Sequence, residues 1–407
     1  MRPLSVLVAL TATSVAAPPA PAQEPPPVVA ISDIRFDSED HVARFPIELH
    51  DWHIFFRGSL GDSSLVWLTL DTGAASGVID AEYARARGLE HSEAQPLFGP
   101  AGSTESARVG GLSLTLPGVR MQNLALSTTP LQFLSAATGR RIVAILGYEF
   151  LSAFIVEIDY AGREMRLHDP AHYAYRGKGG IVPFTLRDND PFVRAQLEMP
   201  GGGTLEGEFV IDTGSGSTVL LASDFAAAHG LPGGLAHKLE ARARGVGGEM
   251  KIVAGRLPGV RLGRFRVEDP VVLFPAGQIT EPGSAGNIGG GLLRRFRVIF
   301  DYPGRRMILE PQPGPAEREE FDMSGIALTA RGAHLDSIRV ERVRSNSPGD
   351  EAGVKPGDLL ERVNGRAAPA IGLDSLRTLF RKETTCDLVL RREGRALPVK
   401  LKTRRLL

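Results

Sequence analysis

Short apolar runs alternate with turn residues along most of the chain, which predicts β-strands rather than long helices. Runs such as "FPIEL" and "HIFFRGSL" precede Asp71, and "IVPFTL" and "FVRAQLEM" precede Asp212. A helical stretch follows each acid, "DAEYARARGL" and "ASDFAAAHGL", with a glycine near its end where a helix C-cap is expected. The pattern predicts a mainly β protein with short helices.

The same pattern occurs twice in tandem. "LTLDTGAASGVI" around Asp71 and "VIDTGSGSTVLL" around Asp212 place the two acids at equivalent positions of the two copies. Further on, "ILGYEFLSAFIVEIDYAGREMRLHDP" aligns with "NIGGGLLRRFRVIFDYPGRRMILEP", so that Gly147 pairs with Gly289 at nearly the offset that separates Asp71 from Asp212. Matched spacing of this kind indicates two homologous lobes.

The first residues differ from the rest of the chain. "MRPLSVLVALTATSVAAPPAPAQ" contains one arginine, a short apolar core and an A-x-A cleavage pattern at Ala20-Pro21-Ala22. We therefore expect a signal peptide and an exported protein, periplasmic or secreted. A retained anchor is the alternative, although the core is shorter than the ~20 residues that span a bilayer. No later stretch reaches that length, so we expect no membrane span in the mature chain.

Composition at linkers completes the predicted division of the chain. "HDPAHYAYRGKGG" connects the two lobes, and "PQPGPAEREE" is rich in proline and charge. Residues after the predicted signal peptide form either a pro-segment or a tether. We expect a signal peptide at 1–22, an N-terminal segment at 23–44, a first lobe at 45–170, a second lobe at 171–311, a linker at 312–320 and a third domain at 321–405.

Charge and motifs exclude several classes of function. The chain has 47 Lys plus Arg and 47 Asp plus Glu, so no net field favours a nucleic-acid partner. The single Cys386 excludes an intramolecular disulfide, and the hydrophobic fraction of 43% is enough for cores that hold the fold. H-E-x-x-H, G-x-S-x-G and P-loop patterns are absent and the nine histidines are scattered. We therefore predict no metal and no cofactor.

Asp-Thr-Gly between apolar strands, followed at a matched distance in both copies by an apolar-apolar-Gly motif, resembles the retropepsin-like aspartic proteases. The resemblance covers residues 45–311 and implies two tandem acid-protease β lobes that form a pseudo-dimer. Asp71 and Asp212 would face each other as the catalytic dyad. The supporting residues would be Thr72, Gly73, Thr213, Gly214 and Ser215 in the two loops, with Gly147 and Gly289 beneath them.

Two carboxyl groups that share one proton can supply both the base and the acid of metal-free peptide hydrolysis. A single Asp-Thr-Gly is more often a turn at a strand end, and only the matched pair favours catalysis. One chain already carries both halves, so we expect a monomer. Ser215 follows the second motif where Ala74 follows the first. A serine donor there would favour ionised Asp212 and protonated Asp71.

Two glycine clusters lie where each lobe of this family carries a flap hairpin. They are "GPAG" at residues 99–102 and "GVGG" at residues 245–248. Ordinary surface turns are an equally good interpretation of both.

The third domain resembles a second family. "NSPGDEAGVKPGDLLERVNG", residues 346–365, carries the core signature of a PDZ domain. PDZ domains bind an extended peptide between a sheet edge and a helix, here residues 374–381. The loop "MSGI", residues 323–326, would face the peptide's terminal carboxylate through Ser324, Gly325 and Ile326. A PDZ fold that only packs on the lobes is the alternative.

The sequence therefore predicts an exported aspartic endopeptidase whose PDZ domain binds a polypeptide substrate or partner. A noncatalytic exported scaffold that acts through its PDZ domain is the alternative. Both acids and both following Thr-Gly pairs are intact, which favours the enzyme.

Overall fold

The computed structural model describes residues 33–62, 64–89, 95–99, 102–245, 248–277, 283–312 and 318–407. The predicted signal peptide at residues 1–22 and the middle of the predicted linker, residues 313–317, lie outside the described residues. No helix among the described residues is both long and apolar enough to cross a membrane.

The first lobe is built on an eight-stranded sheet with the order β1-β10-β6-β11-β5-β4-β3, in which β9 pairs with both β10 and β4. At its centre, β11 runs parallel to β5 and antiparallel to β6. The strands are β1 (Ile34–Phe36), β3 (Glu48–His50), β4 (His53–Leu60), β5 (Leu65–Leu70), β6 (Val78–Asp80), β9 (Arg108–Leu116), β10 (Val119–Thr129) and β11 (Ile142–Leu146).

The second lobe repeats this arrangement in a ten-stranded sheet with the order β19-β20-β23-β18-β24-β17-β16-β21-β22, with β15 on β16. Here β24 runs parallel to β17 and antiparallel to β18. The strands are β15 (Thr185–Arg187), β16 (Asp190–Glu198), β17 (Thr204–Asp212), β18 (Val219–Leu221), β19 (Lys238–Gly245), β20 (Gly248–Arg256), β21 (Gly259–Leu262), β22 (Phe265–Glu268), β23 (Val271–Pro275) and β24 (Gly286–Gly289).

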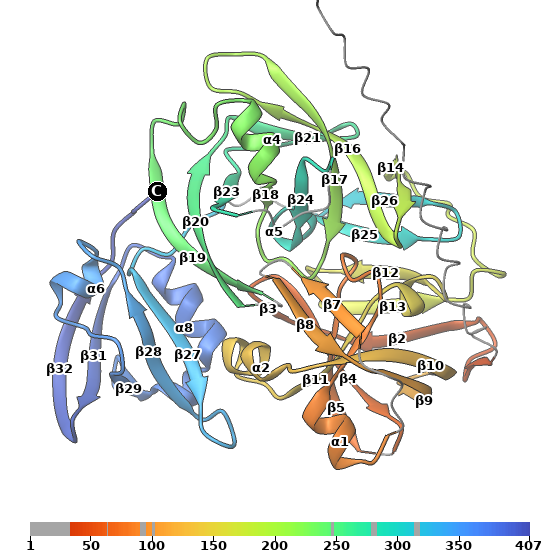
Figure 1. Ribbon diagram of the computed structural model, residues 1–407, viewed down its shortest axis with the longest axis horizontal. Helices are drawn as coiled ribbons and strands as arrows, with labels where there is room; N and C mark the ends of the chain where they lie inside the picture. Colours follow the sequence, from red (N-terminus) through yellow and green to blue (C-terminus); the bar gives the residue numbers. More distant parts are fainter. Residues whose placement is uncertain are drawn as a thin grey trace, which may run out of the picture.

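A third sheet of six strands joins the lobes, which the sequence did not reveal (Figure 1). Its order is β14-β26-β25-β12-β13-β2, and β12 of the first lobe pairs antiparallel with β25 of the second. The strands are β2 (Val42–Pro46), β12 (Ile155–Asp159), β13 (Glu164–His168), β14 (Gly180–Pro183), β25 (Phe296–Asp301) and β26 (Arg306–Pro311).

The predicted boundary of the first lobe at residue 45 starts too late. β1 pairs with β10, and β2 pairs with β13, so residues 34–44 contribute strands rather than a free segment. The physical reason is a short alternation: Ala43 and Phe45 are buried at 0% and 3% exposure, whereas Arg44 between them is exposed.

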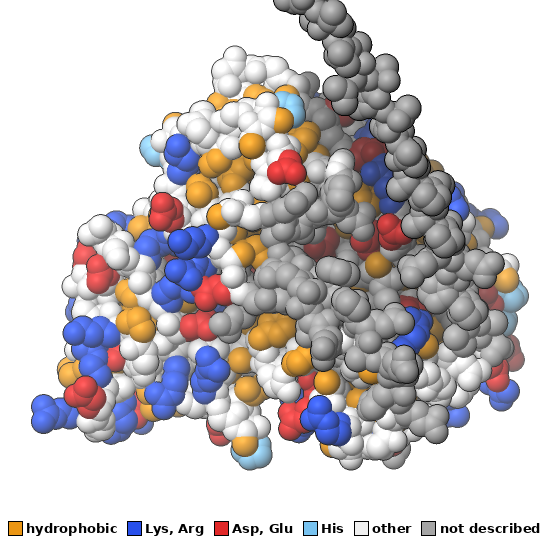
Figure 2. Space-filling model, viewed as in Figure 1, with side chains coloured by type: hydrophobic (Ala, Val, Ile, Leu, Met, Phe, Trp, Pro, Cys, Tyr) orange, Lys and Arg blue, Asp and Glu red, His pale blue; other side chains and the backbone are white. Residues whose placement is uncertain are grey.

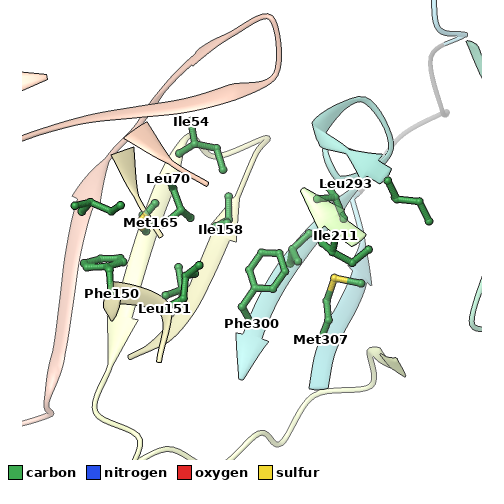
Figure 3. Packing of buried hydrophobic residues seen from close by; sticks show 14 of the residues in the cluster. Ile54, Leu70, Phe150, Leu151, Ile158, Met165, Ile211, Leu293, Phe300 and Met307 are labelled. Atoms are coloured by element: carbon green, nitrogen blue, oxygen red, sulfur yellow. The ribbon is translucent and has the colours of Figure 1, made fainter. Parts of the chain in front are cut away.

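The buried core repeats between the lobes with the spacing of the sequence repeat. Leu70, Leu151, Ile158 and Met165 lie in one half of the core, and Ile211, Leu293, Phe300 and Met307 lie in the other (Figure 3). Each residue of the first set precedes its counterpart by nearly the offset that separates Asp71 from Asp212. Burial of the same positions in both lobes explains why the apolar pattern recurs.

Short helices follow the strands. The predicted helical stretches after the two acids are α1 (Ala81–Ala86) and α4 (Ser223–Ala228). Gly88 and Gly230 lie just past them with φ of 61° and 68°, a left-handed conformation that suits glycine. The others in the lobes are α2 (Gln132–Thr138), α3 (Tyr148–Leu151) and α5 (Gly290–Leu293).

The third domain has its own core and sheet, with the strand order β27-β28-β29-β31-β32 and β30 on β29. It docks against the lobes near α2 and β19 (Figure 1), and arginine and lysine side chains are frequent on its face in Figure 2. Its elements are β27 (Ile326–Arg331), β28 (Ser337–Val343), α6 (Pro348–Glu351), β29 (Leu359–Val363), β30 (Arg366–Ala367), α7 (Ala368–Ile371), α8 (Leu373–Phe380), β31 (Thr385–Arg392) and β32 (Arg395–Lys402).

Candidate active site

Asp71 and Asp212 meet where the two lobes join. Asp71 directly follows β5, and Asp212 is the last residue of β17. A β-carbon on Gly73 would lie 2.9 Å from Cγ of Asp212, and one on Gly214 would lie 2.2 Å from Oδ2 of Asp71. Each carboxyl group therefore lies against the glycine of the opposite loop. Larger residues at these two positions would push the acids away.

Two buried threonines lock the loops together across the lobe junction. The Thr72 N–H donates to Thr213 Oγ1, and the Thr213 N–H donates to Thr72 Oγ1, both at 3.0 Å. The Thr72 hydroxyl donates to Ile211 O at 2.6 Å, and the Thr213 hydroxyl donates to Leu70 O at 3.2 Å. This reciprocal set fixes each acid relative to the other, since every bond crosses from one lobe to the other.

The surroundings of the two carboxyl groups separate their proton affinities. Burial raises the pKa of Asp71 well above its usual range, and the charge of Asp212 raises it further. Burial also raises the pKa of Asp212, but hydrogen bonds from Asn287 and from the Asp71 carboxyl oppose that rise. These causes favour the protonated form of Asp71 more strongly than that of Asp212.

Asn287 is the residue that the sequence analysis missed. Its Nδ2 donates to Asp212 Oδ2 at 2.8 Å from the neighbouring strand β24. The predicted donor, Ser215, does not have this role: its Oγ shares a 2.8 Å hydrogen bond with Ser217 Oγ. The asymmetry itself stays a prediction, and the donor beside Asp212 is Asn287 rather than Ser215.

The glycines beneath the loops leave room for close backbone approach. A β-carbon on Gly147 would lie 2.4 Å from Ala74 O, and one on Gly289 would lie 2.5 Å from Ser215 O. The residues that follow them complete the packing, because the Tyr148 N–H donates to Ala74 O at 3.1 Å and the Gly290 N–H donates to Ser215 O at 2.8 Å. Any side chain at either glycine would displace an acid loop.

A hairpin turn from each lobe reaches the acid loop of the other. The β15–β16 turn places Asn189 so that its Nδ2 donates to Ala75 O at 3.0 Å. The β3–β4 turn lies against the second loop, where a β-carbon on Gly216 would be 2.3 Å from Asp51 O and 3.1 Å from Cε1 of His53. Both turns thus fix the lobes against each other at the site.

Both predicted flap regions form hairpins. β7 (Gln95–Gly99) pairs with β8 (Gly102–Ser106), and β19 pairs with β20 up to Gly245 and Gly248. Residues 100–101 and 246–247, which belong to the two predicted glycine clusters, lie outside the described residues.

The predicted peptide-binding loop of the third domain is already paired within itself. The Ser324 and Gly325 N–H groups donate to the Asp322 carboxylate at 3.3 and 2.6 Å. The Ile326 N–H donates to Ser324 Oγ at 2.9 Å, and the Met323 N–H donates to Phe380 O at 2.9 Å. These four amides therefore already have partners within the domain, and Asp322 holds two of them.

Among the described residues, one group could offer three ligands to a metal: His41, Asp169 and His172. The two imidazole rings stack with centroids 3.9 Å apart and planes within 3°. The lone pairs of stacked rings lie in two separate parallel planes, so one ion cannot lie in the plane of both rings in this arrangement.

Two family models match parts of the chain. Residues 195–292 match a family model described as aspartyl protease, and residues 339–392 match a family model described as PDZ domain. A search of curated proteins found no match. Among solved structures, an aspartic proteinase from Irpex lacteus aligns at 12% identity with a TM-score of 0.45, covering 67% of this chain and 98% of that one.

The family matches and the sheets confirm the predicted fold class. It is mainly β, with two tandem retropepsin-like lobes followed by a PDZ domain.

Proposed function

We propose that the protein is an aspartic endopeptidase in which Asp71 and Asp212 form the catalytic dyad. The observation that carries the proposal is the reciprocal threonine lock, which holds two carboxyl groups with unequal proton affinities against each other. A structural turn needs one Asp-Thr-Gly, whereas this arrangement needs two and a matched interface.

The chemistry follows from the protonation asymmetry. A water molecule between the acids gives a proton to the Asp212 carboxylate, and its oxygen bonds to the carbonyl carbon of the scissile peptide. Asp71 gives its proton to the carbonyl oxygen, which yields a neutral gem-diol. Collapse of the gem-diol re-forms the carbonyl and breaks the C–N bond. The leaving nitrogen takes a proton from Asp212, and Asp71 recovers its proton from the diol hydroxyl.

The remaining parts of the proposal concern the whole chain. One chain supplies both acids, so catalysis is assigned to a monomer. The PDZ domain is assigned the binding of polypeptide, either substrate or partner. The signal-peptide pattern at the N-terminus assigns the reaction to the periplasm or to the outside of the cell.

The test is cleavage of a denatured protein by the purified chain at mildly acidic pH. We expect cleavage that a statine-type transition-state mimic stops and that is absent from Asp212→Asn. A chain that folds natively but leaves the denatured substrate intact over a wide pH range would instead support the noncatalytic scaffold.

A further inference from the structure

The two walls of the PDZ groove are the edge strand β27 and helix α8. A peptide that joins a PDZ domain adds a strand to such an edge, beside the helix. Here Arg377 of α8 donates from Nη2 to Leu328 O of β27 at 3.0 Å, across that space. The groove is thus bridged by one of its own side chains.

The first lobe covers the same edge. Helix α2 packs along β27 (Figure 1), and the Thr329 hydroxyl donates to Ala136 O at 3.3 Å. A β-carbon on Gly139, at the end of α2, would lie 3.7 Å from Cβ of Ala330. An added strand cannot enter while α2 stays in place, because both would occupy the edge of β27.

The β3–β4 turn of the first lobe supplies the polar half of the contact. Asp51 pairs with Arg381, and its N–H donates to Asp374 Oδ1 at 3.2 Å. Burial, with help from Arg377, lowers the pKa of His50 to about 3. The neutral imidazole therefore accepts from Arg377 Nη1 at Nε2, 3.1 Å away.

Charge selects the kind of segment that could replace the turn. Burial would raise the pKa of Asp51, but Arg381 and Arg377 hold it below its usual range, so the turn presents a carboxylate to two guanidinium groups. Asp322 already takes up the loop amides that would hold a terminal carboxylate. An acidic side chain, rather than a free chain end, therefore fits the position beside the two arginines that Asp51 now occupies.

We propose that the PDZ groove is held shut by Asp51, and that an extended polypeptide segment with an acidic side chain opens it by replacing Asp51 at Arg381. The proposal rests on the polypeptide-binding role given to the PDZ domain above. The latch is the name used below for the contact of Asp51 with Arg381 and Asp374.

The latch is in direct contact with the proposed catalytic centre. The turn that carries Asp51 packs on Gly216 of the second acid loop, and a β-carbon on Gly290 of α5 would lie 2.6 Å from Trp52 O. Arg294 stacks over the Trp52 ring at 4.0 Å. Segments bound in the groove are therefore coupled to the dyad through a single turn.

The test measures binding to the full chain carrying Asp71→Asn, so that no probe is hydrolysed. The probe is a labelled nonapeptide with the sequence of residues 47–55, acetylated and amidated, read by fluorescence anisotropy. Adding Asp51→Asn should tighten its Kd at least about tenfold, because the competent fraction of open groove rises. Asp374→Asn, which leaves both arginines in place, should act in the same direction.

Two control probes and two control variants make the result specific. A probe with Asn in place of its aspartate should bind the opened chain about tenfold more weakly. The same Asn probe with a free terminal carboxylate should gain nothing. Arg381→Gln should abolish the preference for the aspartate probe, whereas Arg391→Gln, at the Arg391–Glu361 surface pair, should not.

Equal probe affinity for the chains with and without Asp51→Asn would overturn the latch, as would no binding to either opened variant when circular dichroism shows a native fold. Full recovery of binding by the free carboxylate would overturn the assignment of an acidic side chain. Hydrolysis plays no part in these readings, so a failed latch and a failed protease proposal remain distinguishable.

Discussion

The loops that carry Asp71 and Asp212 have similar backbone arrangements, but the polar side chains beside the two acids differ. Thr72 and Thr213 make equivalent bonds, so the scaffold is nearly symmetric. β24 places Asn287 beside Asp212, whereas the aligned position of β11 holds the apolar Ile145. A duplicated fold thus supplies two equal carboxyl positions, and a single amide makes them chemically unequal.

The β3–β4 and β15–β16 turns also match in backbone conformation and differ in their charged residues. Both turns have two successive residues with positive φ, Asp51 and Trp52 in one and Asp188 and Asn189 in the other. The next residue is His53 in the first lobe. Its positive charge, when present, lowers the pKa of Asp212.

The equivalent residue in the second lobe is Asp190, whose charge raises the pKa of Asp71. A cation near one acid and an anion near the other act in the same direction as Asn287. The lobes therefore differ where the charges near the two acids must differ, and they match where the geometry must match.

The largest effect should come from removing either acid. We expect Asp71→Asn and Asp212→Asn each to lower kcat/KM by at least about a thousandfold, and the double variant to lose little more, because the dyad acts as a unit. Peptide hydrolysis and thermal melts check this. Both variants should melt no lower than wild type, since burial disfavours each charge. Substantial activity in either folded variant would contradict a dyad in which both acids are required.

The threonine lock should give the next largest effect, equal in the two lobes. Thr72→Ala and Thr213→Ala each leave a buried N–H and a buried carbonyl without a partner, at a cost of about 2 kcal/mol in unfolding free energy. Chemical denaturation measures this cost. Thr72→Ser and Thr213→Ser keep the hydroxyl and should stay near wild type. A loss from only one Ala variant would mean that the lock is not reciprocal.

Asn287→Ile places in the second lobe the residue type that Ile145 provides in the first. It should reduce the difference between the pKa values of Asp71 and Asp212. Asn287 donates to Asp212 and lowers its pKa, so losing the donor raises that pKa. Because activity needs one ionised carboxyl group, the acid limb of the kcat/KM profile should move up by about one pH unit. A pH–rate profile with a short peptide substrate measures the position of this acid limb. An unmoved limb would remove Asn287 from the account.

Ser215→Ala should have the smallest effect. Its hydroxyl pairs with Ser217 and not with the dyad, so the acid limb should stay within about 0.3 pH units of wild type. The same pH–rate experiment serves as the matched comparison for Asn287→Ile. A shift in Ser215→Ala as large as that of Asn287→Ile would restore the serine as the source of the asymmetry.

The sequence predicted the parts of the site that depend on repetition. Asp71 and Asp212 could be paired because the same motif recurs at a matched distance, and Gly147 and Gly289 followed from the same alignment. Asn287 could have been found there too, since a polar residue replaces the apolar Ile145 at an equivalent buried strand position.

Other features could not be predicted because they depend on how separate units pack. The contact of the β3–β4 turn with Gly216 and with Arg381 requires knowing where three domains meet. The pairing of β12 with β25 between the lobes could not be predicted either, because the apolar pattern indicates single strands and not which strands pair. Asp322 lies just after the predicted linker, and only the loop geometry shows that its carboxylate accepts from the Ser324 and Gly325 N–H groups.

The most direct test of the central claim is the stoichiometry with which a statine-type inhibitor binds the purified chain, measured by isothermal titration calorimetry with the molar mass followed by light scattering. We expect one inhibitor per monomeric chain, and no binding to Asp71→Asn or Asp212→Asn. One inhibitor per two chains, or undiminished binding to either variant, would contradict a dyad formed by the two unequal lobes of one chain.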